Sequence, residues 1–427
     1  MTAAATPVDV ILPQASEAER RALRFARVRG IIFAALGLIA FLFASNTMDT
    51  QATFKFWLNA SGGSELSISA SAGVLWILAG VITGATGIYQ LTRGAGVRWR
   101  RWLALMLPFW IAATVGTLLA GKPAVLTQVF AGSLEYAFPI SMGAFAAMIC
   151  ERSGMLNIAI EGKFLIGACA GSVAASMTGW VIAGPIVGMI LGALVGLLMA
   201  WLAIEHKVDQ IISGTVVNFG ALGITNFIYL RILQLNTDLN TPPTIETVQI
   251  PVLSQIPVIG PILFSGTPYL YLAIVVMFAL TYMLFRTRWG LRLRASGEYP
   301  QAAGTVGVDV IRIRYRAMML AGAIAGLAGS YLSLHSAGSF QMNMSAGKGF
   351  IAIAAMIFGG WNPIGAFGAA LVFGFSDATQ TLLSSLGVDV PPQLLTSVPY
   401  LVTIVVVAGL VGRVRGPAMA GVPYEQG

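Results

Sequence analysis

Long apolar runs separated by short polar segments dominate the chain. Most of these runs have the length that one bilayer-spanning helix needs, about 20 residues. The pattern therefore predicts an all-α polytopic membrane protein. The expected spans are 28–45, 72–91, 102–120, 126–149, 157–178, 180–204, 210–232, 268–285, 316–335, 364–384 and 396–412.

Glycine spacing predicts how some of these helices pack. Four glycines recur at every fourth position in the span 180–204, and Gly322 and Gly326 repeat the spacing in the span 316–335. Small residues at this interval let two helix backbones touch. We therefore expect these helices to be buried against protein over part of their surface.

The composition excludes several other classes of protein. Of the 427 residues, 57% are hydrophobic and 10% are charged, whereas soluble domains carry about 25% charged residues. The net charge of +8 does not indicate a nucleic-acid partner, because the basic residues are scattered among the loops between apolar runs. Cys150 and Cys169 form neither a disulfide framework nor a metal-ligand spacing. Because motifs for ATP binding and hydrolytic catalysis are missing, we expect no enzyme activity, metal or cofactor on this chain.

The loop charges predict the orientation in the membrane. With a cytoplasmic N-terminus, 21 of the 25 Lys and Arg residues lie on the cytoplasmic side, as the positive-inside rule requires. Both termini are then cytoplasmic, and the number of crossings is even. The arginine-rich start resembles a signal peptide, but we expect an uncleaved anchor, because many further spans follow.

A short apolar segment at 349–360 is expected to be a half-helix. About 12 residues extend roughly 18 Å, too little to cross about 30 Å of hydrocarbon, and the even number of crossings requires the segment to pair with 364–384. It ends at Gly359-Gly360-Trp361-Asn362-Pro363. Irregular backbone at membrane depth must be buried in protein or line a wet cavity. Trp361 and Asn362 are therefore candidates for a solute pathway.

Two groups of polar residues are further candidates for the pathway or its gate. Asn157 and Glu161 are four apart and are expected on one helical face; Glu161 either caps or pairs with Arg152 or Lys163 at the interface, or takes part in gating. Other polar residues either join helices or face a cavity, where they would bind a neutral, hydroxyl-rich solute. These residues are Asp377 with Gln380, and Thr215 with Asn218.

The cytoplasmic loop 286–316 contains a predicted docking helix. Pro300 suits the first turn of a helix, and small residues follow it as far as Gly307. A short helix with a smooth face should lie parallel to the membrane. The candidate docking residues are Gly297, Glu298, Ala302, Ala303 and Gly307.

These same blocks carry a resemblance to a known family. They are 151–162, 290–307 with Arg312-Ile313-Arg314-Tyr315, and 349–363, and the sequence at 212–218 is similar too. The chain resembles permease subunits of ABC importers of the ribose and branched-chain amino acid class, most closely the nucleoside-type permeases that work with basic-membrane-lipoprotein-like binding proteins. The match extends over roughly 126–412.

The resemblance implies a domain organisation. About ten core helices would form the permease fold, and about two extra helices would precede it. The expected segments are a cytoplasmic N-terminal segment (1–27), additional helices (28–101), the permease domain (102–412) with its coupling loop (286–316), and a cytoplasmic tail (413–427).

The resemblance also implies partners and a location. The chain would lie in the bilayer of the bacterial cytoplasmic membrane and import a solute, most simply a nucleoside, together with a second and different permease chain. Separate ATPase subunits carrying ATP and Mg²⁺ would dock near 297–307, and an extracytoplasmic binding protein would deliver the solute. Tyr299 and Lys163 depart from the residues usual in the family, which weakens the solute assignment more than the family assignment.

Other functions stay open at this point. The solute could be a simple sugar or an amino acid. An ion-coupled secondary transporter would need matching broken helices in two halves, and a membrane scaffold would leave Asn157, Glu161 and Asp377 without a purpose.

Overall fold

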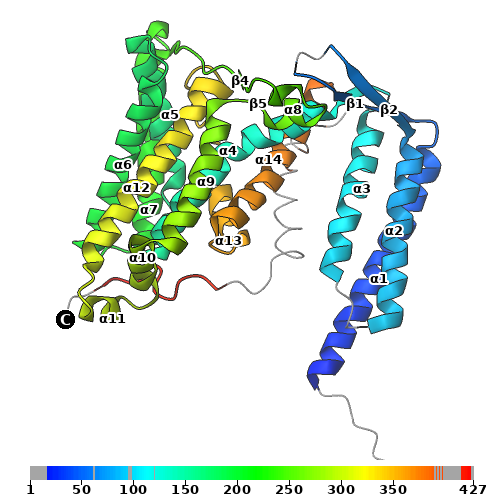
Figure 1. Ribbon diagram of the computed structural model, residues 1–427, viewed down its shortest axis with the longest axis horizontal. Coiled ribbons are helices and arrows are strands. Elements are labelled where there is room, and N and C mark those ends of the chain that lie inside the picture. Colours follow the sequence, from blue (N-terminus) through cyan, green and yellow to red (C-terminus); the bar gives the residue numbers. More distant parts are fainter. Residues whose placement is uncertain are drawn as a thin grey trace, which may run out of the picture. The chain divides into compact units, whose positions relative to one another are not determined.

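The computed structural model describes residues 17–60, 63–94, 99–119, 121–388 and 415–424, with Pro391, Leu394 and Ser397 (Figure 1). Apart from Ser397, the predicted span 396–412 lies outside these residues. Every other predicted span coincides with an observed helix. The chain divides into two compact units, one of Met1–Phe54 with Ser67–Ala124 and one of Lys55–Leu66 with Val125–Gly427.

The first unit contains three helices, α1 (Glu17–Asn46), α2 (Ala72–Arg93) and α3 (Trp99–Leu119). The Trp76 ring of α2 stacks on Phe43 of α1 at 5.1 Å between ring centres, and its Nε1 donates to Thr117 Oγ1 of α3 at 2.8 Å. A buried tryptophan is favourable where its N–H finds an acceptor. The sequence placed 102–120 in the permease domain; the structure places α3 in the first unit because of this packing.

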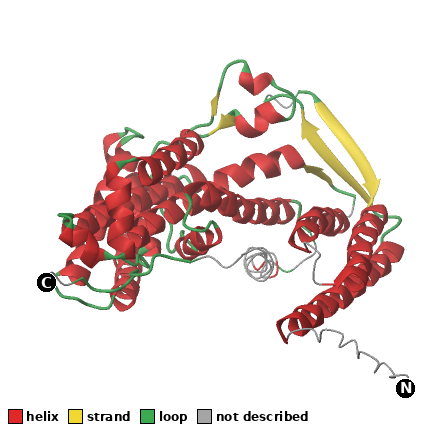
Figure 2. Cartoon of the chain, turned by 60° about the horizontal axis from the view of Figure 1, so that its bottom comes forward, coloured by secondary structure: helices red, strands yellow, loops and turns green. Residues whose placement is uncertain are grey.

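Short strands occur in the connections between helices, which the sequence did not predict (Figure 2). One sheet has the order β2-β1-β3, and a second consists of β4 and β5. Their bounds are β1 (Gln51–Trp57), β2 (Glu65–Ser71), β3 (Pro123–Val125), β4 (Val248–Gln249) and β5 (Ser265–Gly266).

The second unit is a bundle of helices, some interrupted. The longer ones are α4 (Leu126–Arg152), α5 (Ile160–Thr178), α6 (Ala183–Ile204), α7 (Gln210–Ile228), α9 (Pro268–Arg286), α12 (Val310–Tyr331) and α14 (Pro363–Ser385). The shorter ones are α8 (Ile259–Leu263), α10 (Arg288–Glu298), α11 (Pro300–Thr305) and α13 (Lys348–Phe358). One-turn π segments, Tyr229–Leu233 and Leu332–Ser336, extend α7 and α12.

Seven helices in the described part of the chain are long and apolar enough to span a bilayer, and α13 belongs to the shorter apolar helices. The predicted all-α, polytopic architecture is therefore confirmed. Helix α12 begins six residues before the predicted span, because the Asp309 side chain accepts a hydrogen bond from Arg312 N at 2.8 Å and so caps an earlier start. This arrangement is typical of an N-cap.

The glycines of α6 and α12, which the spacing predicted to pack against protein, pack against each other. A Cβ atom placed on Gly192 would collide with the carbonyl oxygen of Gly322, and one on Gly326 would collide with that of Gly188. The two helix backbones therefore touch, as small-residue spacing allows in membranes.

We expect Gly192→Ala to lower the free energy of unfolding by about 1–3 kcal/mol, the usual cost of overpacking. The control is Gly223→Ala on α7, where an added Cβ meets open space. This variant should not lower the free energy of unfolding, because Ala is more favourable than Gly within a helix by roughly 0.5–1 kcal/mol. Denaturant-induced unfolding in detergent measures both. Equal stability of the two variants would contradict the close packing.

Candidate functional site

A non-helical segment runs beside α5 before the half-helix α13 begins. Phe340 exchanges two backbone hydrogen bonds with the side chain of Asn240, which also accepts from Ser172 of α5. Further along, the segment reaches Glu161 in the first turn of α5. Since Ser172 and Glu161 are eleven residues apart on one helix, the segment follows α5 over about 16 Å. Phe340 and Ser345 of this segment are buried against protein, whereas residues 341–343 are exposed.

Glu161 closes the N-terminus of α13. Its carboxylate is 7% exposed and accepts from Ser345 Oγ at 2.6 Å, from Gly347 N at 2.7 Å and from Gly349 N at 2.7 Å. The first amides of a helix have no partner within it, and the helix dipole favours a negative charge there. Glu161 therefore anchors α13 to α5. It does not contact Arg152 or Lys163, the partners that the sequence suggested: these bind the carbonyl oxygen of Trp361 and the side chain of Asn157.

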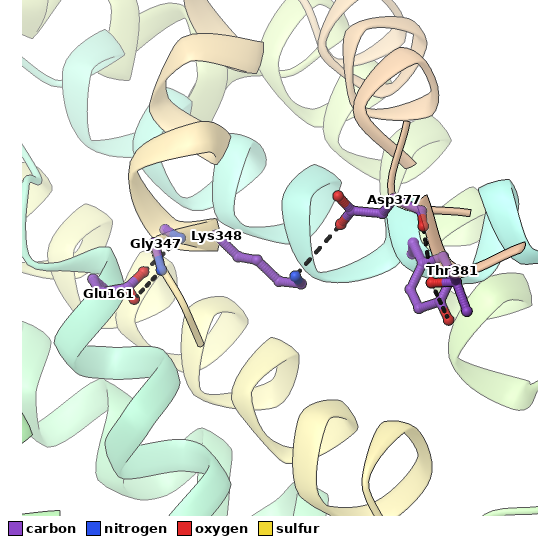
Figure 3. Close-up of polar contacts among 7 residues, drawn as sticks. Glu161, Gly347, Lys348, Asp377 and Thr381 are labelled. Carbon is purple, nitrogen blue, oxygen red and sulfur yellow. Dashed lines mark hydrogen bonds and ion pairs between the residues drawn. The ribbon is translucent and has the colours of Figure 1, made fainter. Parts of the chain in front are cut away.

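The next residue of α13 connects to α14. Lys348 Nζ lies 3.4 Å from Asp377 Oδ2, and both side chains are largely buried. Figure 3 shows Lys348 pointing from the start of α13 toward Asp377, with Glu161 on the other side of the Gly347 backbone. The start of α13 is therefore held by a carboxylate from α5 on one side and by an ion pair with α14 on the other. A buried ion pair is costly to break once one partner is removed.

A small cavity opens between α4 and α14, one turn beyond Asp377. Its volume is about 150 Å³. Thr381 lines it and donates to Tyr136 OH at 3.4 Å, and Gln380 on the same helix is half-buried. The lining residues are Gln128, Val129, Gly132, Tyr136, Ala378, Thr381, Leu382 and Ser385.

Trp361 forms the break between α13 and α14 in an unusual conformation. Its φ is +52° and follows Gly360 at +67°; positive φ is an outlier for a bulky residue and costs about 1–3 kcal/mol. The surroundings offset this cost. Trp361 Nε1 donates to Glu151 Oε2 at 2.7 Å, and Arg152 Nη2 donates to the Trp361 carbonyl at 2.9 Å. The end of α4 therefore holds the break in place.

The structure separates Asn157 from the helical face predicted for it. Helix α5 begins at Ile160, so Asn157 lies in the turn between α4 and α5 and does not share a face with Glu161. Asn157 Oδ1 instead accepts from Lys163 Nζ at 2.6 Å, and the lysine side chain is fully buried. The pairing satisfies a buried ammonium group, which would otherwise be costly.

Three further candidates have structural contacts. Asn218 joins α7 to the start of α5, accepting from Gly162 N at 2.8 Å and donating to Ile158 O at 2.9 Å. Thr215 is exposed, and its hydroxyl donates to Ile211 O within α7. Asn362 caps α14 through Ile364 N at 3.0 Å. The structure thus brings Glu161, Trp361 and Asp377 around α13, but it does not place Thr215 with them.

The predicted docking helix consists of two short helices, α10 and α11, on either side of Tyr299. Glu298, Ala302 and Gly307 are exposed. Gly297 and Ala303 are buried, and a Cβ atom on Gly297 would collide with the carbonyl oxygen of Arg152. Those two residues therefore pack the loop against the bundle and do not belong to its exposed face.

Sequence reasoning missed Glu151 and Lys348 as parts of this site. Glu151 is the first residue of the block 151–162, and its carboxylate at the end of an apolar span was a usable signal, since charges there are expensive. Lys348 could not be assigned to the site from the sequence, because its partner Asp377 lies 29 residues away on another helix.

We expect Glu161→Gln to destabilise the start of α13. One carboxylate oxygen is replaced by an amide NH2 group, which cannot accept a hydrogen bond. At least one hydrogen bond to a charged group is therefore lost, at a cost of about 1.5–3 kcal/mol. Hydrogen exchange at Gly347 and Gly349 should accelerate, and unfolding should occur at lower denaturant concentration. The matched control, Glu246→Gln at an exposed position, should change neither; unchanged exchange in Glu161→Gln would contradict the capping role.

We expect Trp361→Phe to lower the free energy of unfolding by about 1–3 kcal/mol, because Glu151 loses a buried hydrogen-bond donor while the ring volume is largely kept. Trp180→Phe serves as the control, since Trp180 is 55% exposed. Thermal unfolding of both variants in the same detergent provides the comparison. Similar melting temperatures would show that the bond to Glu151 does not support the break.

Comparison with known proteins identifies the family. The family model described as the permease component of the branched-chain amino acid transport system matches residues 129–408. The guanosine ABC transporter permease protein NupQ of Bacillus subtilis (strain 168) is 38% identical over 313 residues, which are 71% of this chain and 98% of the relative. The nucleoside ABC transporter permease protein NupC of Lactococcus lactis subsp. cremoris is 36% identical, over 70% of this chain and 97% of the relative.

A more distant relative is the glucose ABC transporter permease protein TsgB13 of Haloferax volcanii, 25% identical over 55% of this chain and 63% of the relative. No solved structure matches the chain. The matched residues lie within the range 126–412 that the sequence blocks indicated, so the resemblance is confirmed. The chain is thus a multi-pass membrane protein and belongs to the permease-component family of the branched-chain amino acid transport system.

Proposed function

We propose that this chain is the permease subunit of an ATP-driven ABC importer of nucleosides. The observation that carries the proposal is the similarity to two relatives named as guanosine and nucleoside permeases, each matched over nearly its whole length. The extracytoplasmic binding protein of such a system sets much of the specificity, so this chain needs to conduct the solute and not to recognise it tightly.

The pathway would pass along α13 and α14. A half-helix that begins inside the bundle and ends at a strained turn is suited to move as a unit, because both of its ends rest on a few polar contacts. Asp377, Gln380 and Thr381 on α14 offer hydrogen-bonding groups to a neutral, hydroxyl-rich solute. The cavity of about 150 Å³ is smaller than the roughly 300 Å³ of the smaller ligand sites. A second permease chain, of a different sequence, would complete the pathway.

ATP hydrolysis would take place on separate subunits. In this proposal they carry ATP and Mg²⁺ and dock on α11, whose exposed face includes Ala302 and is followed by Val306, 79% exposed. Movement of α11 would reach α13 through the end of α4, since Gly297 of α10 packs on Arg152 and Arg152 binds the Trp361 carbonyl.

The loop charges give the orientation of this arrangement. The N-terminus and the loop containing α10 and α11 would face the cytoplasm, and the segment 233–267, which contains no Lys or Arg, would face the binding protein. The bacterial cytoplasmic membrane is the expected location.

A sugar is the second candidate solute, because TsgB13 is named as a glucose permease. The family description names branched-chain amino acids. Tyr136, Thr381 and Ser385 in the lining of the cavity offer hydrogen bonds to the hydroxyl groups that a nucleoside and a sugar share.

Uptake by the reconstituted complex tests the proposal. We expect ATP-dependent uptake of labelled guanosine that excess adenosine or uridine reduces at least tenfold, and that glucose and leucine leave unchanged. Ala302→Arg should lower uptake at least fivefold by blocking the ATPase contact, whereas Ala302→Ser keeps the surface small and should not. Competition by glucose alone would assign a sugar, and uptake that persists without ATP hydrolysis would indicate an ion-coupled transporter.

A further inference from the structure

The segment Arg415–Tyr424, here called the strap, crosses the ends of several helices of the second unit. Figure 1 shows it as the red segment that passes α10 and approaches α11. The transport function proposed above gives this segment no role. Its contacts, however, connect the parts through which that function would be coupled to ATP hydrolysis.

Backbone hydrogen bonds hold the middle of the strap. Gly421 N donates to the carbonyl of Gly154, in the turn between α4 and α5, at 3.0 Å. Met419 N donates to the carbonyl of Gly297 in α10 at 2.9 Å, and Ala418 N donates to the Glu298 carboxylate at 3.3 Å. The strap therefore ties the last residues of α10 to the end of α4.

The end of the strap lies on α12 and α11. Arg314 of α12 is 2% exposed, donates from Nη1 to the Val422 carbonyl at 3.0 Å, and lies 5.8 Å from the centre of the Tyr424 ring. This distance is within cation–π range. The Tyr424 hydroxyl lies against α11, since a Cβ atom on Gly304 would be 2.7 Å from it.

The start of the strap touches the break between α13 and α14. A Cβ atom on Gly416 would be 2.9 Å from the Trp361 ring. One ten-residue segment thus contacts both the helix proposed to dock the ATPase and the strained turn that ends the half-helix.

The turn in the strap depends on one glycine. Gly421 has a φ of +81°, and an added Cβ would be 2.6 Å from the Leu156 side chain. Most other contacts use backbone atoms, which nearly any residue supplies. Gly421 and Tyr424 are therefore the positions where a substitution should release the strap.

We propose that the strap is a coupling element: it positions α10 and α11 against the ends of α4 and α12, so that ATPase-driven movement of α11 reaches the Trp361 turn. The inference rests on the proposed docking of the ATPase at α11. Arg314 and Tyr424 are positioning residues in it, because they act through α11.

The test uses the complete transporter in proteoliposomes and measures solute imported per ATP hydrolysed. We expect Gly421→Val and Tyr424→Ala to lower this ratio at least fivefold. Tyr424→Phe keeps the ring over Arg314 and should leave the ratio unchanged. Gly179→Val is the matched control: Gly179 also has a positive φ, +64°, but open space around it, so it introduces similar strain away from the strap.

Hydrogen exchange of the same permease variants, without the other subunits, reports on the strap itself. Residues 297–305 should exchange faster in Gly421→Val and Tyr424→Ala than in the unaltered chain, Tyr424→Phe or Gly179→Val. Faster exchange with an unchanged import ratio would overturn the coupling role, and unchanged exchange would overturn the contacts. If the unaltered complex imports nothing, the proposed function fails, while the exchange result still decides whether the strap holds α10 and α11.

Discussion

The carboxylate of Glu161 is the contact on which the arrangement around α13 depends. A helix that begins inside a bundle leaves its first amides without partners in a medium that offers little water. Glu161 accepts from two of these amides and from Ser345, and it comes from the first turn of another helix. The starts of α5 and α13 therefore meet at one buried negative charge. Their dipoles, which would repel each other, both point their positive ends at it.

The other end of α13 is held by a different kind of contact. Trp361 adopts a left-handed conformation that its side chain disfavours, and the end of α4 keeps it there through Glu151 and Arg152. A strained turn persists only where its surroundings over-determine it. Both ends of α13 are therefore held by side chains from other helices, Glu161 at its start and the end of α4 at the break.

The two units differ in how they relate to the family. The family match begins at residue 129, so the helices α1, α2 and α3 precede it. They form a unit with its own aromatic contacts, in which the ring centres of Trp76 and Trp110 are 5.2 Å apart and the two rings donate to Thr117 and Thr83, respectively. The second unit contains the half-helix, the break and the loop 286–316. The half-helix, the break and this loop thus lie within the residues that the family model matches.

The sequence by itself determined the helical spans within the described residues, the short helix before the Gly359–Pro363 break, the close packing of the glycine-spaced helices and the family. These follow from the lengths of apolar runs and from residue spacing, which are properties of neighbouring residues. It could also name Glu161 and Trp361 as important, because a charge or a break in an apolar region is costly wherever it lies.

Only the tertiary structure decided what these residues contact. Glu161 binds Gly349, 188 residues away; Glu151 binds Trp361 across 210 residues; and Lys348 pairs with Asp377 on another helix. Tertiary packing also decides that Asn157 lies outside α5 and that Gly297 packs against the backbone of Arg152. The physical reason is that a buried polar group takes whichever partner the packed helices bring within about 3 Å. Chain spacing does not specify that partner.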